Sequence, residues 1–194
     1  MTANIRRKMF TTDEYHRMRE AGILGEDEHL ELINGEIVFM AAAIGSYHAA
    51  CVNRLNQLFV GNFAGKAIVH VQNPVRIREH SEPEPDIALL KPRQDFYAEA
   101  HPGPEDVLLI VEVSDSSLEY DRETKLPLYA KAGIEEAWIV NLKDGCVEVY
   151  TKPSEQGYDV LRKFRKGMTV VSDSFPDVHV SVDEIIGGKY PLSV

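Results

Sequence analysis

Four acidic side chains interrupt or border apolar runs of the chain: Glu31, Asp86, Glu112 and Glu136. Glu112 is the most prominent of them, because apolar residues lie on both sides of it in the run 108–113. A charge on a buried strand costs free energy unless it is paired or bound to a metal ion. A structural ion pair or an edge position explains Glu112 as well as a functional role does, so the pattern alone leaves both open.

Asp86 strengthens the functional interpretation of Glu112. It follows Pro85, which restricts the backbone where the strand-like run 86–90 begins, although a Pro-Asp turn is also a common way to enter a strand. Two carboxylates at the ends of neighbouring strands would supply the hard oxygen ligands that Mg²⁺ prefers. A cation held there would polarise a phosphoryl oxygen and activate water.

Three further polar residues permit two interpretations each. Glu31 is either a third acid at the same site or an exposed residue of a hairpin strand. Lys125 is either functional or an exposed helical lysine paired with Asp121 four residues earlier, a contact that contributes roughly 0.2–0.5 kcal/mol. His48 lies near a helix start, where packing or capping is the more common role. The histidines show no HxxxH or HxH spacing, so no zinc site is expected.

Local signals predict the elements that would position these residues. Thr11 and Glu14 form a capping box for a short helix that stops at Gly22, and Asn34-Gly35 predicts a hairpin turn. Amphipathic spacing predicts a helix over 46–65, capped near Ser46. A further helix should run from about 117 to 132, kinked or restarted at Pro127 and closed by Gly133, and a short last helix should be capped at Ser181. The expected strands are 67–71, 75–77, 86–90, 106–113, 135–141, 146–152 and 158–164.

This order of elements predicts an α/β or α+β domain with a mixed sheet, and a length of 194 residues predicts a single domain over 1–194. The net charge of −10 is mild evidence against non-specific binding of nucleic acid, although carboxylates gathered at a metal site add negative charge. Two cysteines outside any CxxC pattern indicate buried thiols in a reducing cytoplasm. No apolar run is long enough to span a membrane.

The runs EPDIALL and LLIVEVSDSSLEYDRETKLPLYAKAGIEEAWIVNLKDGCVEVYTKP resemble the Uma-two family of endonucleases. The run LELINGEIVFM followed by His48 is similar to the opening of that family, and the resemblance covers about Phe10 to Ile186. It implies a restriction-endonuclease-like, PD-(D/E)xK fold, in which a central mixed β-sheet is flanked by α-helices. It also implies one magnesium-dependent site that hydrolyses phosphodiester bonds, with Mn²⁺ as a substitute cation.

The resemblance also implies residue roles. Asp86 matches the motif aspartate and Glu112 the motif acid, and the main-chain carbonyl of Val113 would be a further metal ligand. Glu31 matches the acid near the start of the family. Ser114 occupies the usual lysine position, and the lysine would have moved onto the following helix as Lys125. These matches favour a rearranged active site over a broken one.

The sequence therefore predicts a Mg²⁺-dependent endodeoxyribonuclease. Asp86 and Glu112 would hold the metal with help from Glu31, and Lys125 would stabilise negative charge or orient the attacking water. The competing prediction is a nuclease-fold domain without turnover that binds a partner or regulates one. Hydrolysis of RNA or of a small phosphoester stays open. Because a duplex is often cut on both strands, a twofold homodimer is expected.

Overall fold

The computed structural model describes residues 7–25, 28–40 and 45–188, so the ends of the predicted domain, 1–6 and 189–194, lie outside it. Its centre is a six-stranded mixed sheet in the order β3-β4-β5-β6-β7-β8, in which β5 and β6 run parallel and the other neighbours antiparallel. The sheet strands are β3 (Ile68–Val71), β4 (Ile87–Leu90), β5 (Val107–Ser114), β6 (Glu136–Asn141), β7 (Cys146–Ser154) and β8 (Gly157–Arg165).

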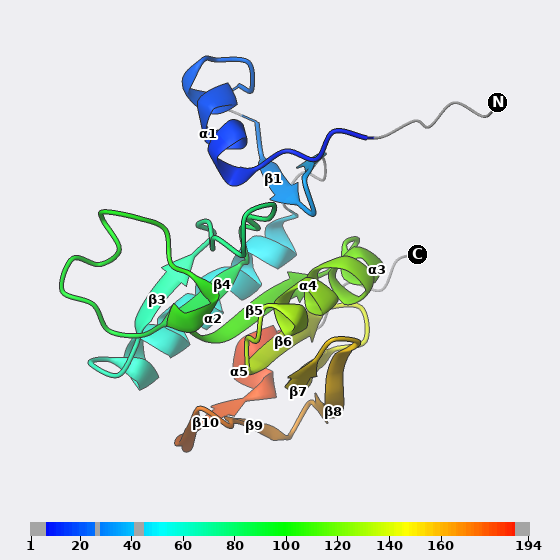
Figure 1. Cartoon of the computed structure of the whole chain (residues 1–194). Coiled ribbons are helices and arrows are strands. Elements are labelled where there is room, and N and C mark those ends of the chain that lie inside the picture. Colours follow the sequence, from blue (N-terminus) through cyan, green and yellow to red (C-terminus); the bar gives the residue numbers. More distant parts are fainter. Residues whose placement is uncertain (1–6, 26–27, 41–44, 189–194) are drawn as a thin grey trace.

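Helices and two small strand pairs surround this sheet (Figure 1). The helices are α1 (Thr12–Glu20), α2 (Ser46–Phe63), the 3₁₀ turn η1 (Pro104–Asp106), α3 (Leu118–Tyr120), the π turn η2 (Asp121–Lys125), α4 (Leu126–Lys131) and α5 (Val182–Ile186). The pairs are β1 (Leu30–Ile33) with β2 (Glu36–Phe39), and β9 (Thr169–Ser172) with β10 (Phe175–Ser181). The predicted α/β architecture, a mixed sheet flanked by helices, is confirmed.

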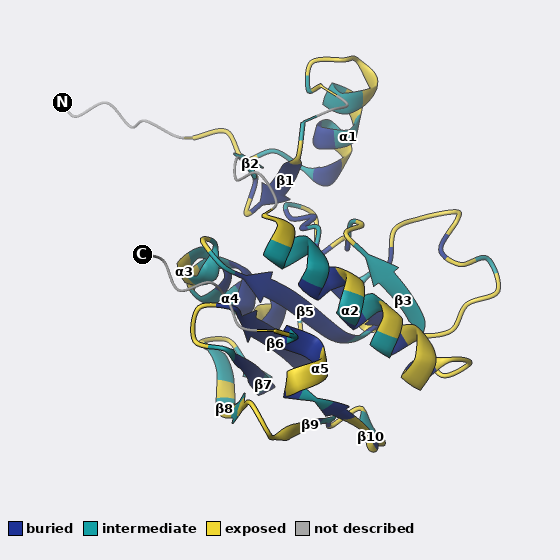
Figure 2. Ribbon diagram, turned by 180° about the vertical axis from the view of Figure 1, so that it is seen from behind, coloured by how far each residue is buried: buried dark blue, intermediate teal, exposed yellow. Residues whose placement is uncertain are grey.

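The two faces of the sheet carry separate apolar cores. On one face α2, α5 and β10 pack over alternate side chains of the central strands, with Phe59 and Trp138 fully buried. On the other face α4 packs through Leu126, Leu128 and Tyr129. Figure 2 shows β5 and β6 buried along their lengths. This double cover explains why β5 is apolar at both odd and even positions.

The N-terminal region forms as its local signals predict. The capping box of Thr11 and Glu14 is present at α1, and the turn residues Asn34 (φ 49°) and Gly35 (φ 77°) join β1 to β2. Positive φ at both central residues is the type I′ geometry that Asn-Gly favours. The hairpin is attached to the segment before β4, because the N–H of Glu82 donates a 2.7 Å hydrogen bond to the Leu32 carbonyl.

The helical segment after β5 contains a wide turn. The N–H of Leu126 bonds to the carbonyl of Asp121, five residues back, so 121–125 is π-helical. Pro127 follows at once and has no N–H to continue an α-helical ladder. The expected kink or restart at Pro127 is thus a π turn that precedes the proline, and Gly133 closes the helix with φ 81°.

One predicted strand was wrong, and one pair of strands was missed. Residues 75–77 form no strand, because the N–H of Ile77 donates to the nearby Ser81 carbonyl. Val75 and Ile77 are apolar because their side chains are buried. The N-cap of α2 is Gly45, and Ser46 is the first helical residue, so the cap predicted near Ser46 is confirmed to within one residue. The pair β9–β10 was not predicted. Its strands are partly exposed and interrupted by a bulge, so the alternation of apolar and polar residues that predicts a strand is weak there.

The predicted burial of both cysteines is confirmed, and Cys51 and Cys146 are free thiols. Within the described residues, no helix combines the length and apolar character needed to cross a bilayer.

Candidate active site

The antiparallel pairing of β4 and β5 brings Asp86 beside Glu112. Ile87 is paired with Val111, so Asp86, which precedes Ile87, lies opposite Glu112, which follows Val111. Asp86 Oδ2 accepts a 2.8 Å hydrogen bond from the Val113 N–H, which fixes the carboxylate against β5. The side chain of Asp86 stays 13% exposed, so this carboxylate borders solvent.

Two further side chains contact the carboxylate of Asp86. His48 Nε2, on α2, lies 3.1 Å from Asp86 Oδ2, and the Gln72 amide donates to Oδ1 at 3.1 Å. Burial lowers the pKa of His48, but the hydrogen bond and charge of Asp86 outweigh this and raise it overall. His48 therefore contacts the site, whereas its sequence position indicated packing or capping.

Lys125 is buried between two acids. Its Nζ lies 2.9 Å from Glu31 Oε1 and 3.3 Å from Glu112 Oε1, and the residue is 2% exposed. The solvent-exposed position considered for Lys125 is therefore not found. Asp121, its expected surface partner, is buried as well and accepts 2.7 Å hydrogen bonds from the hydroxyls of Ser114 and Ser117.

Tyr129 completes the contacts of Glu112. Its hydroxyl, from α4, donates a 2.5 Å hydrogen bond to Glu112 Oε1, the oxygen that Lys125 also faces. Ser114, in the expected lysine position, instead hydrogen-bonds to Asp121 and so connects β5 to the π turn. Lys125 thus connects the helical segment after β5 to the hairpin, through Glu31 on β1, and to the central sheet, through Glu112 on β5.

Burial and charge set the protonation of this cluster. Burial raises the pKa of Glu112 to about 8, although nearby Lys125 lowers it, and burial also raises the pKa of Asp121. Burial lowers the pKa of Lys125, yet the charges of Glu112, Glu31 and Asp121 outweigh burial and raise it above its ordinary value. Lys125 is therefore the charged member, and Glu112 is the acid that takes up a proton near neutral pH.

The donor set fits a divalent cation with oxygen ligands. Three carboxylates, those of Glu31, Glu112 and Asp121, act on the ammonium of Lys125, and the charge of Asp86 acts on Glu112, so acid is in excess. Glu31 Oε2 is buried and accepts no hydrogen bond within the described part of the chain. A buried carboxylate oxygen without a donor is costly and would be satisfied by a cation. Hard oxygen ligands favour Mg²⁺ or Mn²⁺ over softer metals.

Glu136, the fourth acid noted in the sequence, lies elsewhere. Its carboxylate accepts hydrogen bonds from Trp138 Nε1 at 2.6 Å and from the Ser172 hydroxyl at 2.8 Å. The backbone N–H of Asp173 also donates to it at 2.9 Å. Glu136 therefore ties β9 to β6 and has a structural role.

Sequence reasoning assigned no catalytic or metal-binding role to several residues that contact the site. These are His48, Gln72, Ser114, Asp121 and Tyr129. The four-residue spacing of Asp121, Lys125 and Tyr129 placed them on one helix face, and this was the available signal for Tyr129. Gln72 carried no signal in the sequence.

The model of the Uma2 family, described as "Putative restriction endonuclease", matches residues 12–183. The chain belongs to the Uma2 family. This confirms the resemblance seen in its central motif. The fold is similar to the crystal structure of a protein from Anabaena variabilis ATCC 29413, titled "putative nuclease belonging to DUF820". The TM-score is 0.71 and the identity 17%, over 91% of this chain and 97% of that one. None of the curated proteins compared with the chain matches it.

Proposed function

We propose that this Uma2 protein is a metal-dependent endonuclease that hydrolyses phosphodiester bonds of DNA. The observation that carries the proposal is the buried Lys125 ammonium, 3.3 Å from Glu112, together with Asp86 opposite Glu112 on the neighbouring strand. The acids supply a cation site, and the lysine supplies a fixed positive charge next to it. Both are needed where a phosphate bearing negative charge is attacked.

Each residue has a separate task in this proposal. Asp86 and Glu112, with the carbonyl of Val113, would hold Mg²⁺ or Mn²⁺. When bound, such a cation polarises a phosphoryl oxygen and lowers the pKa of a bound water. Lys125 stabilises the negative charge that develops on phosphate as the water oxygen bonds to phosphorus and the ester P–O bond breaks. Glu31 keeps Lys125 charged and in place.

His48 and Tyr129 act as positioning residues. His48 Nε2 contacts Asp86 Oδ2, the oxygen that also accepts from the Val113 N–H, and Tyr129 fixes the rotation of the Glu112 carboxylate. Residues that support metal ligands typically contribute about 10- to 100-fold to affinity or activity. Both side chains come from helices packed on the sheet, which keeps their geometry constant.

A cleavage assay tests the proposal. Untagged protein is incubated with supercoiled plasmid, linear duplex, single-stranded RNA and a small phosphodiester, each with Mg²⁺, with Mn²⁺ or with chelator. We expect metal-dependent cleavage of DNA that Asp86→Asn abolishes. Lys66→Ala, which removes an exposed lysine, should retain it. Absence of cleavage of any substrate by the wild type would overturn the proposal and support a binding or regulatory domain. Cleavage of RNA alone would overturn the DNA assignment.

We also propose that two copies act together as a homodimer. With a net charge of −10, the chain must meet a duplex through a local surface, and a twofold dimer would place two sites on the two strands. The chain has a mass of 21.8 kDa, and light scattering at micromolar concentration should give twice this value. A purely monomeric protein would contradict this.

A further inference from the structure

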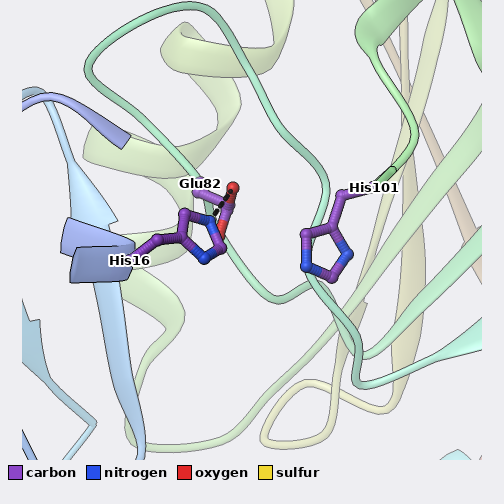
Figure 3. A group of neighbouring side chains, drawn as sticks. All are labelled: His16, Glu82 and His101. Carbon is purple, nitrogen blue, oxygen red and sulfur yellow. Dashed lines mark hydrogen bonds and ion pairs between the residues drawn. The ribbon is translucent and has the colours of Figure 1, made fainter. Parts of the chain in front are cut away.

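A second cluster of metal-ligating side chains lies apart from the acids around Lys125. His16 is on α1, Glu82 lies in the segment between β3 and β4, and His101 lies in the loop between β4 and β5. One ligand atom of each lies within 4.8 Å of the other two. Figure 3 shows the three side chains pointing toward one another from separate segments.

The contacts within the cluster are close. His16 Nε2 lies 2.9 Å from Glu82 Oε1 and 3.0 Å from Oε2. The rings of His16 and His101 are nearly parallel, with centroids 5.9 Å apart and 24° between their planes. Tetrahedral zinc, with bonds of about 2.0–2.2 Å, separates its ligand atoms by roughly 3.3 Å. Small rotations of the two exposed rings would reach this geometry.

Burial of Glu82 is the second observation that indicates a cation. Its side chain is 2% exposed, and among the described residues no lysine or arginine forms an ion pair with it. A carboxylate removed from water requires positive charge nearby, and neither a lysine nor an arginine in the described part of the chain supplies it here. His16 and His101 reach solvent, so a cation has an entry path to the buried carboxylate.

We propose that His16, Glu82 and His101 form a zinc site. Two imidazoles and one carboxylate are a ligand set suited to Zn²⁺, with water in the fourth position. The set differs from the all-oxygen acids near Lys125, which favour Mg²⁺. The proposal is independent of nuclease activity, and its ligands come from segments too far apart for any spacing motif.

A third cluster, Asp144, Cys146 and Glu148, does not compete as a zinc site. Arg122 donates to Glu148 Oε1 at 2.5 Å, and Lys163 lies 2.9 Å from the same oxygen. These two cations already neutralise the buried carboxylate. Burial also raises the pKa of Cys146, which disfavours the thiolate that zinc requires.

The zinc site would link α1 to the loop that carries His101 and to the segment that carries Glu82. That segment also holds Glu31, because the Glu84 N–H donates a 3.0 Å hydrogen bond to Glu31 Oε1. Bound zinc would therefore oppose local opening of α1 and of the hairpin. We assign the site a stabilising role for this part of the molecule.

Calorimetric titration of untagged, chelator-treated protein with Zn²⁺ tests the site. We expect one zinc per chain in the wild type. His101→Ala removes an exposed side chain, and its circular dichroism should match the wild type. Its zinc affinity should fall by more than about 100-fold, since even residues that only support a ligand contribute about 10- to 100-fold. His179→Ala, an exposed histidine on β10, is the matched control and should bind normally.

Co²⁺ substitution identifies the ligands. Wild type and Cys146→Ser should show the visible absorption of four-coordinate cobalt, and His101→Ala should lack it. Asp86→Asn with Glu112→Gln should leave zinc binding unchanged, which separates this site from the proposed magnesium site. Unchanged zinc affinity in His101→Ala, or loss of zinc binding in the Asp86/Glu112 double variant, would overturn the proposal.

Discussion

The hydroxyl of Tyr129 and the ammonium of Lys125 converge on one oxygen, Glu112 Oε1, at 2.5 Å and 3.3 Å. Both donors come from one helical face, four residues apart, and both are buried. Their convergence fixes the rotation of the Glu112 carboxylate before any ligand arrives. Pre-organised geometry of this kind reduces the cost of forming a metal site.

Removing the Tyr129 hydroxyl should weaken metal binding without disrupting the core. Tyr129→Phe keeps the ring, and loss of a hydrogen bond to the largely protonated Glu112 should cost about 0.5–1.5 kcal/mol of stability in metal-free protein. Mg²⁺ affinity should fall about 10-fold at neutral pH, because loss of the donor raises the Glu112 pKa further. Calorimetry on Tyr129→Phe and on Tyr97→Phe, which loses a hydroxyl far from the site, checks this. Equal Mg²⁺ affinities in both variants would refute a positioning role.

Metal should stabilise the folded chain through Asp86 and Glu112. A cation that binds only the folded state raises stability by about 2.7 kcal/mol at 100 times its Kd. Thermal melts with and without Mg²⁺ or Mn²⁺ should show this as a higher Tm in the wild type. Asp86→Asn with Glu112→Gln should fold and show no such rise. A rise of wild-type size in the double variant would mean that the cation binds elsewhere.

The metal-free protein should lose stability as pH rises from about 4.5 to 8. Burial raises the pKa of Glu112 to about 8 from 4.5, so the folded state holds an extra proton in this window. The free energy of unfolding then falls with rising pH. The total effect is a few kcal/mol at most, since one pKa unit corresponds to about 1.4 kcal/mol.

Urea unfolding across this pH range measures the slope, with Glu112→Gln as the comparison. The free energy of unfolding should decline less steeply in the variant. Part of the decline should remain, because the pKa of His48 is also raised in the folded state. Saturating Mg²⁺ should reverse the trend in the wild type, because the cation competes with the proton on Glu112. A wild-type slope that Glu112→Gln leaves unchanged would assign the pH dependence to other groups.

Lys125 and Glu31 should be energetically coupled. Lys125→Met leaves two buried acids without their cation and should cost about 3–5 kcal/mol in metal-free protein. Adding Glu31→Gln removes one uncompensated charge, so the double variant should be more stable than the sum of the single losses predicts. A double-mutant cycle in urea should give a coupling energy of about 0.5–3 kcal/mol. Additive losses would show that the 2.9 Å contact contributes no stability.

Elements with local signals were predictable from the sequence, and long-range contacts were not. Asn34-Gly35 and the capping box at Thr11 act over a few residues, so their geometry follows from residue type. The burial of Lys125 depends on Glu31, 94 positions away, and the run DRETK has the composition of a solvated helix. Asp86 and Glu112 were placed together because neighbouring strands commonly pair in space and because both match acids of the family motif.

The wide turn at Asp121–Lys125 makes the length of this segment as important as its composition. A π turn holds one residue more than an α-helical turn, so deleting one residue would allow the segment to close as a regular helix. Lys125 is the last residue of the turn, so the deletion would shift it relative to Asp121 at the start of the turn and alter its contacts with Glu31 and Glu112. Insertions and deletions in this turn should therefore be tolerated far less than substitutions at exposed residues, such as Glu123 within the turn and Glu119 before it.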